Sequence, residues 1–169
     1  MTKALVVWLK STAISHAMTT SPVLWPFCET LHFIGLALLV GGAGFIDLRL
    51  MGLFRSVPLS AVMQMRKWAI LGVGINVVTG TLFFIGEPGQ YIHNVAWYFK
   101  LLFLAVALIN IAVFETTQGK KMLTVAAGQD TPVSFKVVGA VSMGSWFLVL
   151  YFGRMLPFIG NAFGEDPES

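Results

Sequence analysis

The sequence predicts an all-α membrane protein: a single domain over residues 1–169 in which a short interfacial helix precedes a bundle of four transmembrane helices. Two observations predict this fold. Of the residues, 56% are hydrophobic and only 11% are charged, whereas a soluble domain carries roughly 25% charged residues. The apolar residues also gather in four stretches, each close to the about 20 residues that a helix needs to cross a bilayer. We therefore expect membrane lipid to cover the chain.

The N-terminal segment, residues 1–20, precedes the first apolar stretch. Ala4, Leu5 and Trp8 recur at helical spacing, and Lys3 and Lys10 lie elsewhere. This pattern is typical of a helix that lies in the membrane interface, and a mobile tail is the alternative. Because Lys10 interrupts the apolar run, and a secretory signal needs roughly 7–15 apolar residues, we expect no cleavable signal peptide.

The four spans are predicted at about residues 23–46, 68–85, 95–114 and 137–159. Pro26 lies at the beginning of the first, since proline is tolerated in a first helical turn, and Gly86-Glu87-Pro88-Gly89 ends the second. Residues 119–132 form a polar connection, and residues 160–169 an acidic tail. Glycine is frequent inside the spans, and small residues let helices approach closely in lipid. A tight bundle is expected.

The distribution of lysine and arginine predicts the orientation. The connections after the first and third spans are basic, whereas the connection between the second and third has no basic residue; the basic residues are Arg49, Arg55, Arg66, Lys67, Lys120, Lys121 and Lys136. Basic residues accumulate on the cytoplasmic side. Both termini are therefore predicted on the outer, periplasmic side of a bacterial inner membrane.

Ionisable side chains inside a span are expensive and are candidates for function. Most of them lie toward the predicted outer face: Glu29 and His32 in the first span, Lys100 in the third and Arg154 in the fourth. We expect these four to converge in space, because an unpaired charge at mid-bilayer costs roughly 2.5–3.5 kcal/mol. The net charge of +3 is too small and scattered to predict nucleic-acid binding.

His32 is the strongest single candidate. Glu29 and Cys28 precede it by three and four residues and share its helix face. Glu-x-x-His is a spacing used in the metal sites of helix bundles, and a carboxylate at that spacing also orients an imidazole. Three interpretations stay open: a structural histidine bonded to a neighbouring helix, a heme ligand, and a ligand of copper or another metal.

A six-coordinate b-type heme needs two axial ligands. His32 and His93 are the expected pair, since both lie near the outer boundary, and Met155 or Met143 is the fallback because methionine also serves as an axial ligand. Arg154 and Lys100 are placed to meet the heme propionates; they complete the predicted cofactor site together with Glu29. Three histidines are too few for two bis-histidine hemes.

Copper is the second cofactor considered. Thiolate and thioether ligands favour Cu(I), and Cys28, His32, Met18 and His16 lie near one another in the sequence. The chain has no Met-x-Met or His-x-His cluster. Motifs of hydrolases and of glycine-rich phosphate loops are absent from it as well.

Parts of the chain resemble a family of small bacterial four-helix membrane proteins without an assigned function. The similar segments cover roughly residues 25–160 and are Glu29-Thr30-Leu31-His32 with Gly35, Asp47-Leu48-Arg49-Leu50-Met51-Gly52, Asn94-Val95-Ala96-Trp97 with Lys100 and Asn110, and Trp146 with Gly153-Arg154. The resemblance implies the four-helix fold and importance for Glu29, His32, Asp47, Arg49, Lys100 and Arg154, but no activity.

More distantly, the chain is similar to the membrane domain of copper-resistance protein D and to bacterial b-type cytochromes. It lacks the methionine clusters of copper carriers and the four heme histidines of diheme cytochromes. The function expected from the sequence is a membrane electron-transfer subunit that holds one b-type heme and links quinone to a periplasmic redox partner. The alternatives are a non-catalytic accessory subunit of a larger complex or homo-oligomer, and a copper-handling protein.

Overall fold

The computed structural model describes residues 2–159, and within them every element of regular structure is a helix. The elements are α1 (Thr2–Lys10), α2 (Ala13–Thr20), α3 (Leu24–Leu50), α4 (Leu59–Val62), the 3-10 turn η1 (Met63–Met65), α5 (Arg66–Gly86), α6 (Pro88–Ile92), α7 (Val95–Met122) and α8 (Val133–Ile159). Four helical stretches are long and apolar enough to cross a membrane: α3, α4 to α5, α7 and α8. The predicted all-α fold is thereby confirmed, and the number of helical stretches able to span a membrane agrees with the prediction.

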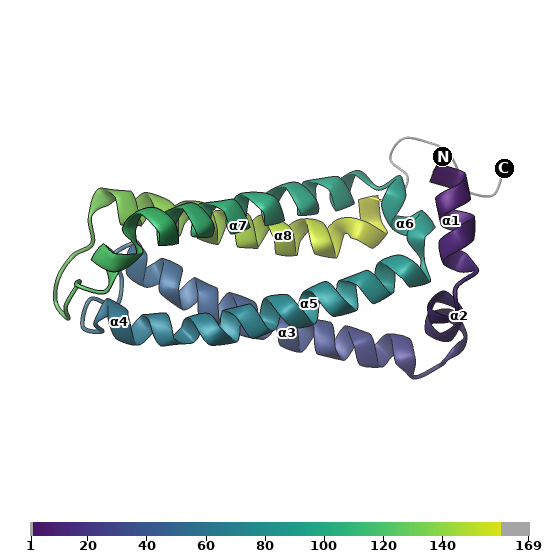
Figure 1. The fold of residues 1–169 in the computed structure, drawn as a ribbon, viewed down its shortest axis with the longest axis horizontal. Helices are drawn as coiled ribbons and strands as arrows, with labels where there is room; N and C mark the ends of the chain where they lie inside the picture. The colour runs from purple at the N-terminus through teal and green to yellow at the C-terminus, as the bar shows by residue number, and fades with distance from the viewer. Residues whose placement is uncertain (1, 160–169) are drawn as a thin grey trace.

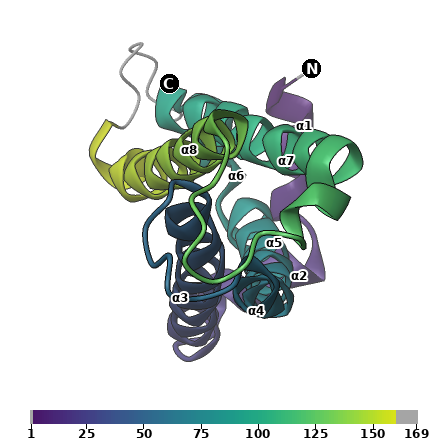
Figure 2. The ribbon, with the colours of Figure 1, turned by 90° about the vertical axis from the view of Figure 1, so that its left-hand side faces the viewer.

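The long helices form two antiparallel pairs. Helix α3 packs along α5, and α7 packs along α8 (Figure 1). The pairs meet mainly through α3 and α8, so that they form two layers when the bundle is viewed from its end (Figure 2). Helices α1, α2 and α6 lie at one end of the bundle and α4 lies at the other (Figure 1). We call these the α6 end and the α4 end.

The helices extend beyond the predicted apolar stretches. The first span reaches Leu50, the third continues to Met122, and the fourth begins at Val133, so the connection between α7 and α8 covers residues 123–132 rather than 119–132. Hydropathy reports what lipid covers, whereas helical hydrogen bonding continues through polar residues. Lys120 and Lys121 lie in the last turn of α7, where cations interact favourably with the helix dipole.

Glycine brings the paired helices into backbone contact. A Cβ atom at Gly72 of α5 would lie 2.5 Å from the carbonyl oxygen of Gly35 and 2.6 Å from the nitrogen of Leu39, both in α3. At the contact of α3 with α8, a Cβ atom at Gly139 would lie 2.7 Å from the carbonyl oxygen of Asp47. No larger residue fits at either crossing, and this close approach is what small residues permit in lipid.

Arg49 joins the connections at the α4 end. Its side chain is fully buried, and it donates hydrogen bonds to the carbonyl oxygens of Val57 at 2.8 Å and of Gln129 at 3.1 Å. These acceptors belong to the connections after α3 and after α7. A guanidinium with several fixed donors suits this task better than an ammonium, and it holds the two predicted cytoplasmic connections together.

Residues 2–20 form two short helices rather than one. Helix α1 runs across the α6 end of the bundle (Figure 1), where Lys10 pairs with Glu87 at 3.5 Å. In α2 the buried Ser15 donates to the carbonyl oxygen of Gly86 at 3.2 Å. The position of this segment in the membrane interface stays a prediction. The acidic tail, residues 160–169, lies outside the described residues.

Large apolar side chains cover the outside of the long helices. Phe33 of α3, Val78 of α5, Ile109 of α7 and Phe147 of α8 each expose more than half of their surface. Exposed apolar area of this extent on a soluble protein would drive association, whereas lipid solvates it. The exterior therefore fits a multi-pass membrane protein.

Candidate functional site

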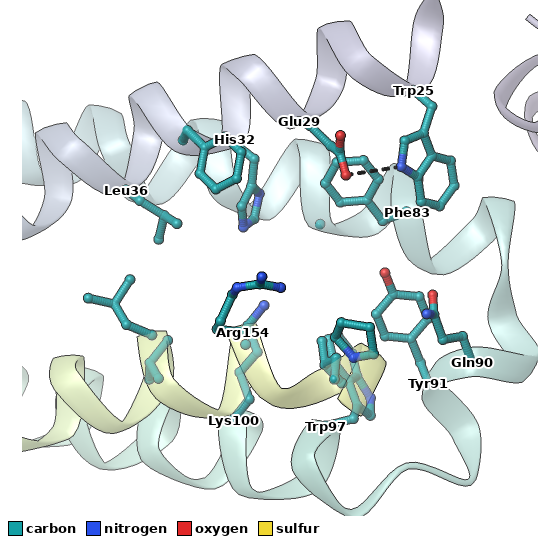
Figure 3. Close-up of a pocket in the computed structure, with 17 residues that line it drawn as sticks. Trp25, Glu29, His32, Leu36, Phe83, Gln90, Tyr91, Trp97, Lys100 and Arg154 are labelled. Atoms are coloured by element: carbon teal, nitrogen blue, oxygen red, sulfur yellow. Dashed lines mark hydrogen bonds between the residues drawn. The ribbon is translucent and has the colours of Figure 1, made fainter. Parts of the chain in front are cut away.

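A pocket of about 670 Å³ lies between the two helix pairs near the α6 end. We call it the His32 pocket. Helix α3 contributes Trp25, Glu29, His32, Phe33 and Leu36, and α5 contributes Gly80 and Phe83; the opposite wall is Gln90, Tyr91, Trp97, Lys100, Val149, Leu150, Gly153, Arg154, Leu156 and Pro157. The four side chains expected to converge, those of Glu29, His32, Lys100 and Arg154, all line it (Figure 3).

Thr79 fixes the imidazole of His32. The Nδ1 atom of His32 lies 2.7 Å from Oγ1 of Thr79, and that hydroxyl donates its own proton to the carbonyl oxygen of Ile75 at 2.7 Å. When that hydroxyl donates to Ile75, Nδ1 carries the ring proton and donates it to Thr79. In a neutral imidazole the other nitrogen then has a free lone pair. His32 points across the pocket toward α8 (Figure 3), which makes Nε2 available to a ligand.

Two cations face His32 from the other helix pair. The Nζ atom of Lys100 lies 5.6 Å from the ring centroid of Trp97, and the guanidinium of Arg154 lies 4.9 Å from that of Phe158. Lys100 passes close to Gly153 of α8, where a Cβ atom would lie in ordinary van der Waals contact with Nζ at 3.7 Å. Within residues 2–159 neither cation has a carboxylate oxygen within 4.0 Å.

The rest of the lining is aromatic, with one carboxylate. The ring centroids of Trp25 and Phe83 are 5.0 Å apart, and those of His32 and Phe83 are 5.6 Å apart. Glu29 accepts a hydrogen bond from Trp25 Nε1 at 3.3 Å. Tyr91 lies outside the spans, and burial raises its pKa to about 12, with smaller contributions from Glu29 and Glu87. Its phenol is therefore protonated at neutral pH and can donate a hydrogen bond.

The remaining predicted ligands lie elsewhere. His93 caps the C-terminal end of α6 and His16 lies on α2; both are exposed, and neither lines the His32 pocket. Cys28 is buried away from the pocket lining, and Met155 packs with Tyr91 and Leu156 in an apolar cluster. His93 follows α6 and does not line the pocket, so the expected axial pair of His32 and His93 does not share it.

The predicted copper ligands are not gathered either. Within the described residues, no group of three or more His, Cys, Asp or Glu side chains is arranged to hold a metal ion. Met18 is buried in α2, whereas His16 on the same short helix is exposed.

Thr79 is the partner of His32 that the sequence analysis did not single out. A threonine inside a span usually bonds the carbonyl of its own preceding turn, and Thr79 does so at Ile75. One signal in the sequence could have identified Thr79: it is a hydroxyl group inside the second span, where it can bond a histidine in the first span.

A comparison of the chain with protein-family models, with curated proteins and with solved structures finds no match.

Proposed function

We propose that the chain holds one b-type heme in the His32 pocket, near the outer face of a bacterial inner membrane, and serves as an electron-transfer subunit between quinone and a periplasmic redox partner. The observation that carries this proposal is the state of His32. Its Nδ1 atom lies 2.7 Å from Thr79 Oγ1, so Nε2 is the nitrogen left to coordinate a ligand in a pocket with two cations.

The lining fits a flat, amphipathic dianion. Ligand pockets hold about 300–1,000 Å³, and this one holds about 670 Å³. Trp25, Phe83 and Trp97 offer apolar ring faces to a macrocycle. Lys100 and Arg154 supply two positive charges without a carboxylate partner in residues 2–159, matching two propionates. Charge-assisted hydrogen bonds to carboxylates are the stronger kind.

The pocket contains one histidine, which changes the ligation expected from the sequence. His93 is outside it, so we propose single-histidine ligation by His32. Heme held by one proximal histidine is a common arrangement. The cofactor supplies one-electron chemistry; the chain orients the imidazole through Thr79, neutralises the propionates with Lys100 and Arg154, and excludes water with its aromatic lining.

Absorption spectroscopy of the protein purified from its native host in mild detergent tests the proposal. We expect a reduced-minus-oxidised heme b spectrum that His32→Ala abolishes. His93→Ala is the matched control, because His93 is exposed and outside the pocket, and this variant should keep the wild-type spectrum. Folded wild-type protein that carries no heme, or heme that survives His32→Ala unchanged, refutes the assignment and favours the accessory-subunit alternative.

A further inference from the structure

A second pocket, of about 440 Å³, lies between the same helix pairs toward the α4 end. We call it the Asp47 pocket. Leu39 and Trp146 line it, whereas Leu36 and Val149 line the His32 pocket. Three helical residues correspond to about 4.5 Å, so roughly one layer of side chains separates the two pockets. Most of the lining is aliphatic.

Three buried polar atoms in the Asp47 pocket lack a hydrogen bond of ordinary geometry, although Asp47 and Ser142 lie near enough to interact with each other. They are Oδ2 of Asp47, Oγ of Ser142 and Nε1 of Trp146. The three side chains expose only 4%, 1% and 5% of their surface, respectively. An unsatisfied buried polar group costs about 1–3 kcal/mol, so three at one pocket indicate a polar partner that enters it.

The three groups belong to one constellation. Ser142 and Trp146 are four residues apart on α8 and therefore lie on one face of that helix. Asp47 meets α8 one turn earlier, where its carbonyl oxygen leaves no space for a side chain at Gly139. Donors and acceptors from α3 and α8 thus meet across the helix crossing, within one pocket.

The charges near Asp47 are already paired with each other. Arg66 Nη1 donates to Glu115 Oε1 at 2.8 Å, which joins α5 to α7 in the lining of the pocket. Within residues 2–159 no basic nitrogen lies within 4.0 Å of the Asp47 carboxylate. Ser142 lies near enough to interact with the Asp47 carboxyl through a hydrogen bond, and a carboxyl group with two oxygens has capacity for a further donor.

The donor and acceptor types define the ligand. Trp146 Nε1 only donates, Asp47 oxygens accept, and Ser142 Oγ does both. A metal cation fails to satisfy Trp146, because an N–H group offers it no lone pair. A hydroxyl group satisfies Asp47 and Trp146 together, since it donates its proton to Asp47 and accepts a hydrogen bond from Trp146. The aliphatic lining requires that the rest of the molecule be apolar.

We propose that the Asp47 pocket binds the hydroxyl group of a neutral, lipid-soluble molecule between Asp47, Ser142 and Trp146. Lipid-soluble hydroquinones and aliphatic alcohols share this chemistry. The site uses other residues than the His32 pocket and does not depend on the heme.

Fluorine NMR of the full chain labelled with 5-fluorotryptophan tests the proposal. The chain has five tryptophans, and Trp146→Phe assigns the signal of Trp146. The probe is trimethylhydroquinone, kept reduced under argon. We expect a saturable shift of the Trp146 signal, while those of Trp25 and Trp97 in the other pocket stay unchanged. Dodecanol in a parallel titration identifies the aliphatic source if it binds more tightly.

Variants and probe analogues separate hydrogen bonding from partition into detergent. The dimethyl ether of the probe has no hydroxyl proton, and it should bind about tenfold more weakly, the effect of one lost hydrogen bond. Ser142→Ala and Asp47→Asn should weaken the hydroquinone as well. Ser145→Ala is the matched control, because Ser145 is equally buried but donates to Val141 at 2.7 Å and lies outside the pocket lining.

Three results overturn the proposal. The first is the absence of a saturable shift with both the hydroquinone and dodecanol. The second is an equal affinity for the ether, which means that the hydroxyl group is not recognised. The third is an affinity that Ser142→Ala and Asp47→Asn leave unchanged in folded protein.

Discussion

The Nδ1 atom of His32 lies 2.7 Å from Oγ1 of Thr79, although the two residues are separated by 47 positions in the chain. The contact spans the α3–α5 pair, and it determines which imidazole nitrogen faces the pocket. It depends on the close helix approach at Gly72, two turns earlier on α5. The polar contact and the small-residue contact are thus parts of one interface, and both are open to test.

Thr79→Val should weaken heme binding without removing the ligand. Valine keeps the shape of threonine but cannot accept a hydrogen bond from Nδ1, so the imidazole of His32 loses its orientation. Removal of a group that orients a metal-binding histidine typically lowers metal affinity about 10–100-fold. Titration of heme into the apoprotein measures the effect. Thr81→Val is the control, because the exposed Thr81 makes the same type of backbone bond, to Val77 at 2.7 Å. Equal affinities for both variants would contradict the assigned role of Thr79.

Lys100→Gln and Arg154→Gln should each lower the reduction potential of the heme. A nearby cation favours the reduced heme, which carries one positive charge fewer, and Coulomb interactions are stronger at a partly buried site than in water. A spectroelectrochemical titration measures the potential. Lys67→Gln is the control, since Lys67 lies on the ring of Trp68 at 5.6 Å, near the α4 end. Potentials that stay constant in both pocket variants would argue against propionate contacts.

Gly72→Ala should destabilise the fold, whereas Gly74→Ala should not. The added methyl group at Gly72 would press on the backbone of Gly35 and Leu39 at 2.5 and 2.6 Å, and overpacking typically costs about 1–3 kcal/mol. A methyl group at Gly74 would meet nothing within 4 Å. Unfolding in mixed detergent micelles measures both. If the two variants are equally stable, the α3–α5 crossing is not as close as described.

Asp130 should make stability depend on pH at the α4 end. It accepts from Lys136 at 2.8 Å and pairs with Arg55 at 3.2 Å. The hydrogen bond from Lys136 lowers the pKa of Asp130, assisted by Thr131 and Arg55. A depressed carboxyl pKa contributes stability above the unfolded value, about 3.9, and the contribution disappears as the pH falls through the folded value.

Thermal unfolding of the wild type and of Asp130→Asn between neutral and acidic pH tests this sign. The wild type should be the more stable protein at neutral pH. The difference should shrink as the solution becomes acidic, because protonated aspartic acid and asparagine are both neutral. A difference that is constant over the whole range would show that the charge of Asp130 is not its cause.

The orientation in the membrane is tested by cysteine labelling in a Cys28→Ala background. His93 at the α6 end and Ala127 at the α4 end are both exposed, so each tolerates a cysteine. We expect His93→Cys to react with an impermeant maleimide from the periplasm and Ala127→Cys to react only after lysis. The reverse pattern would invert the predicted topology and place the His32 pocket near the cytoplasm.

The sequence by itself determined the number of spans, the helical class and the candidates at membrane depth. Hydropathy and charge are properties of each residue in its solvent, and they need no knowledge of partners. Glu29, His32, Lys100 and Arg154 could therefore be selected before any helix was placed. The helix ends were predicted less well, because backbone hydrogen bonding continues beyond the apolar residues.

Only the tertiary structure decided which side chains meet. The rotation of each helix about its axis depends on contacts such as Gly72 with Gly35 and Gly139 with Asp47, and a fraction of a turn decides whether a residue faces a pocket or lipid. This rotation pairs His32 with Thr79 and brings Asp47, Ser142 and Trp146 to one pocket. Packing between segments far apart in the chain determines which face of each helix is turned inward. The composition of a single segment does not predict that packing.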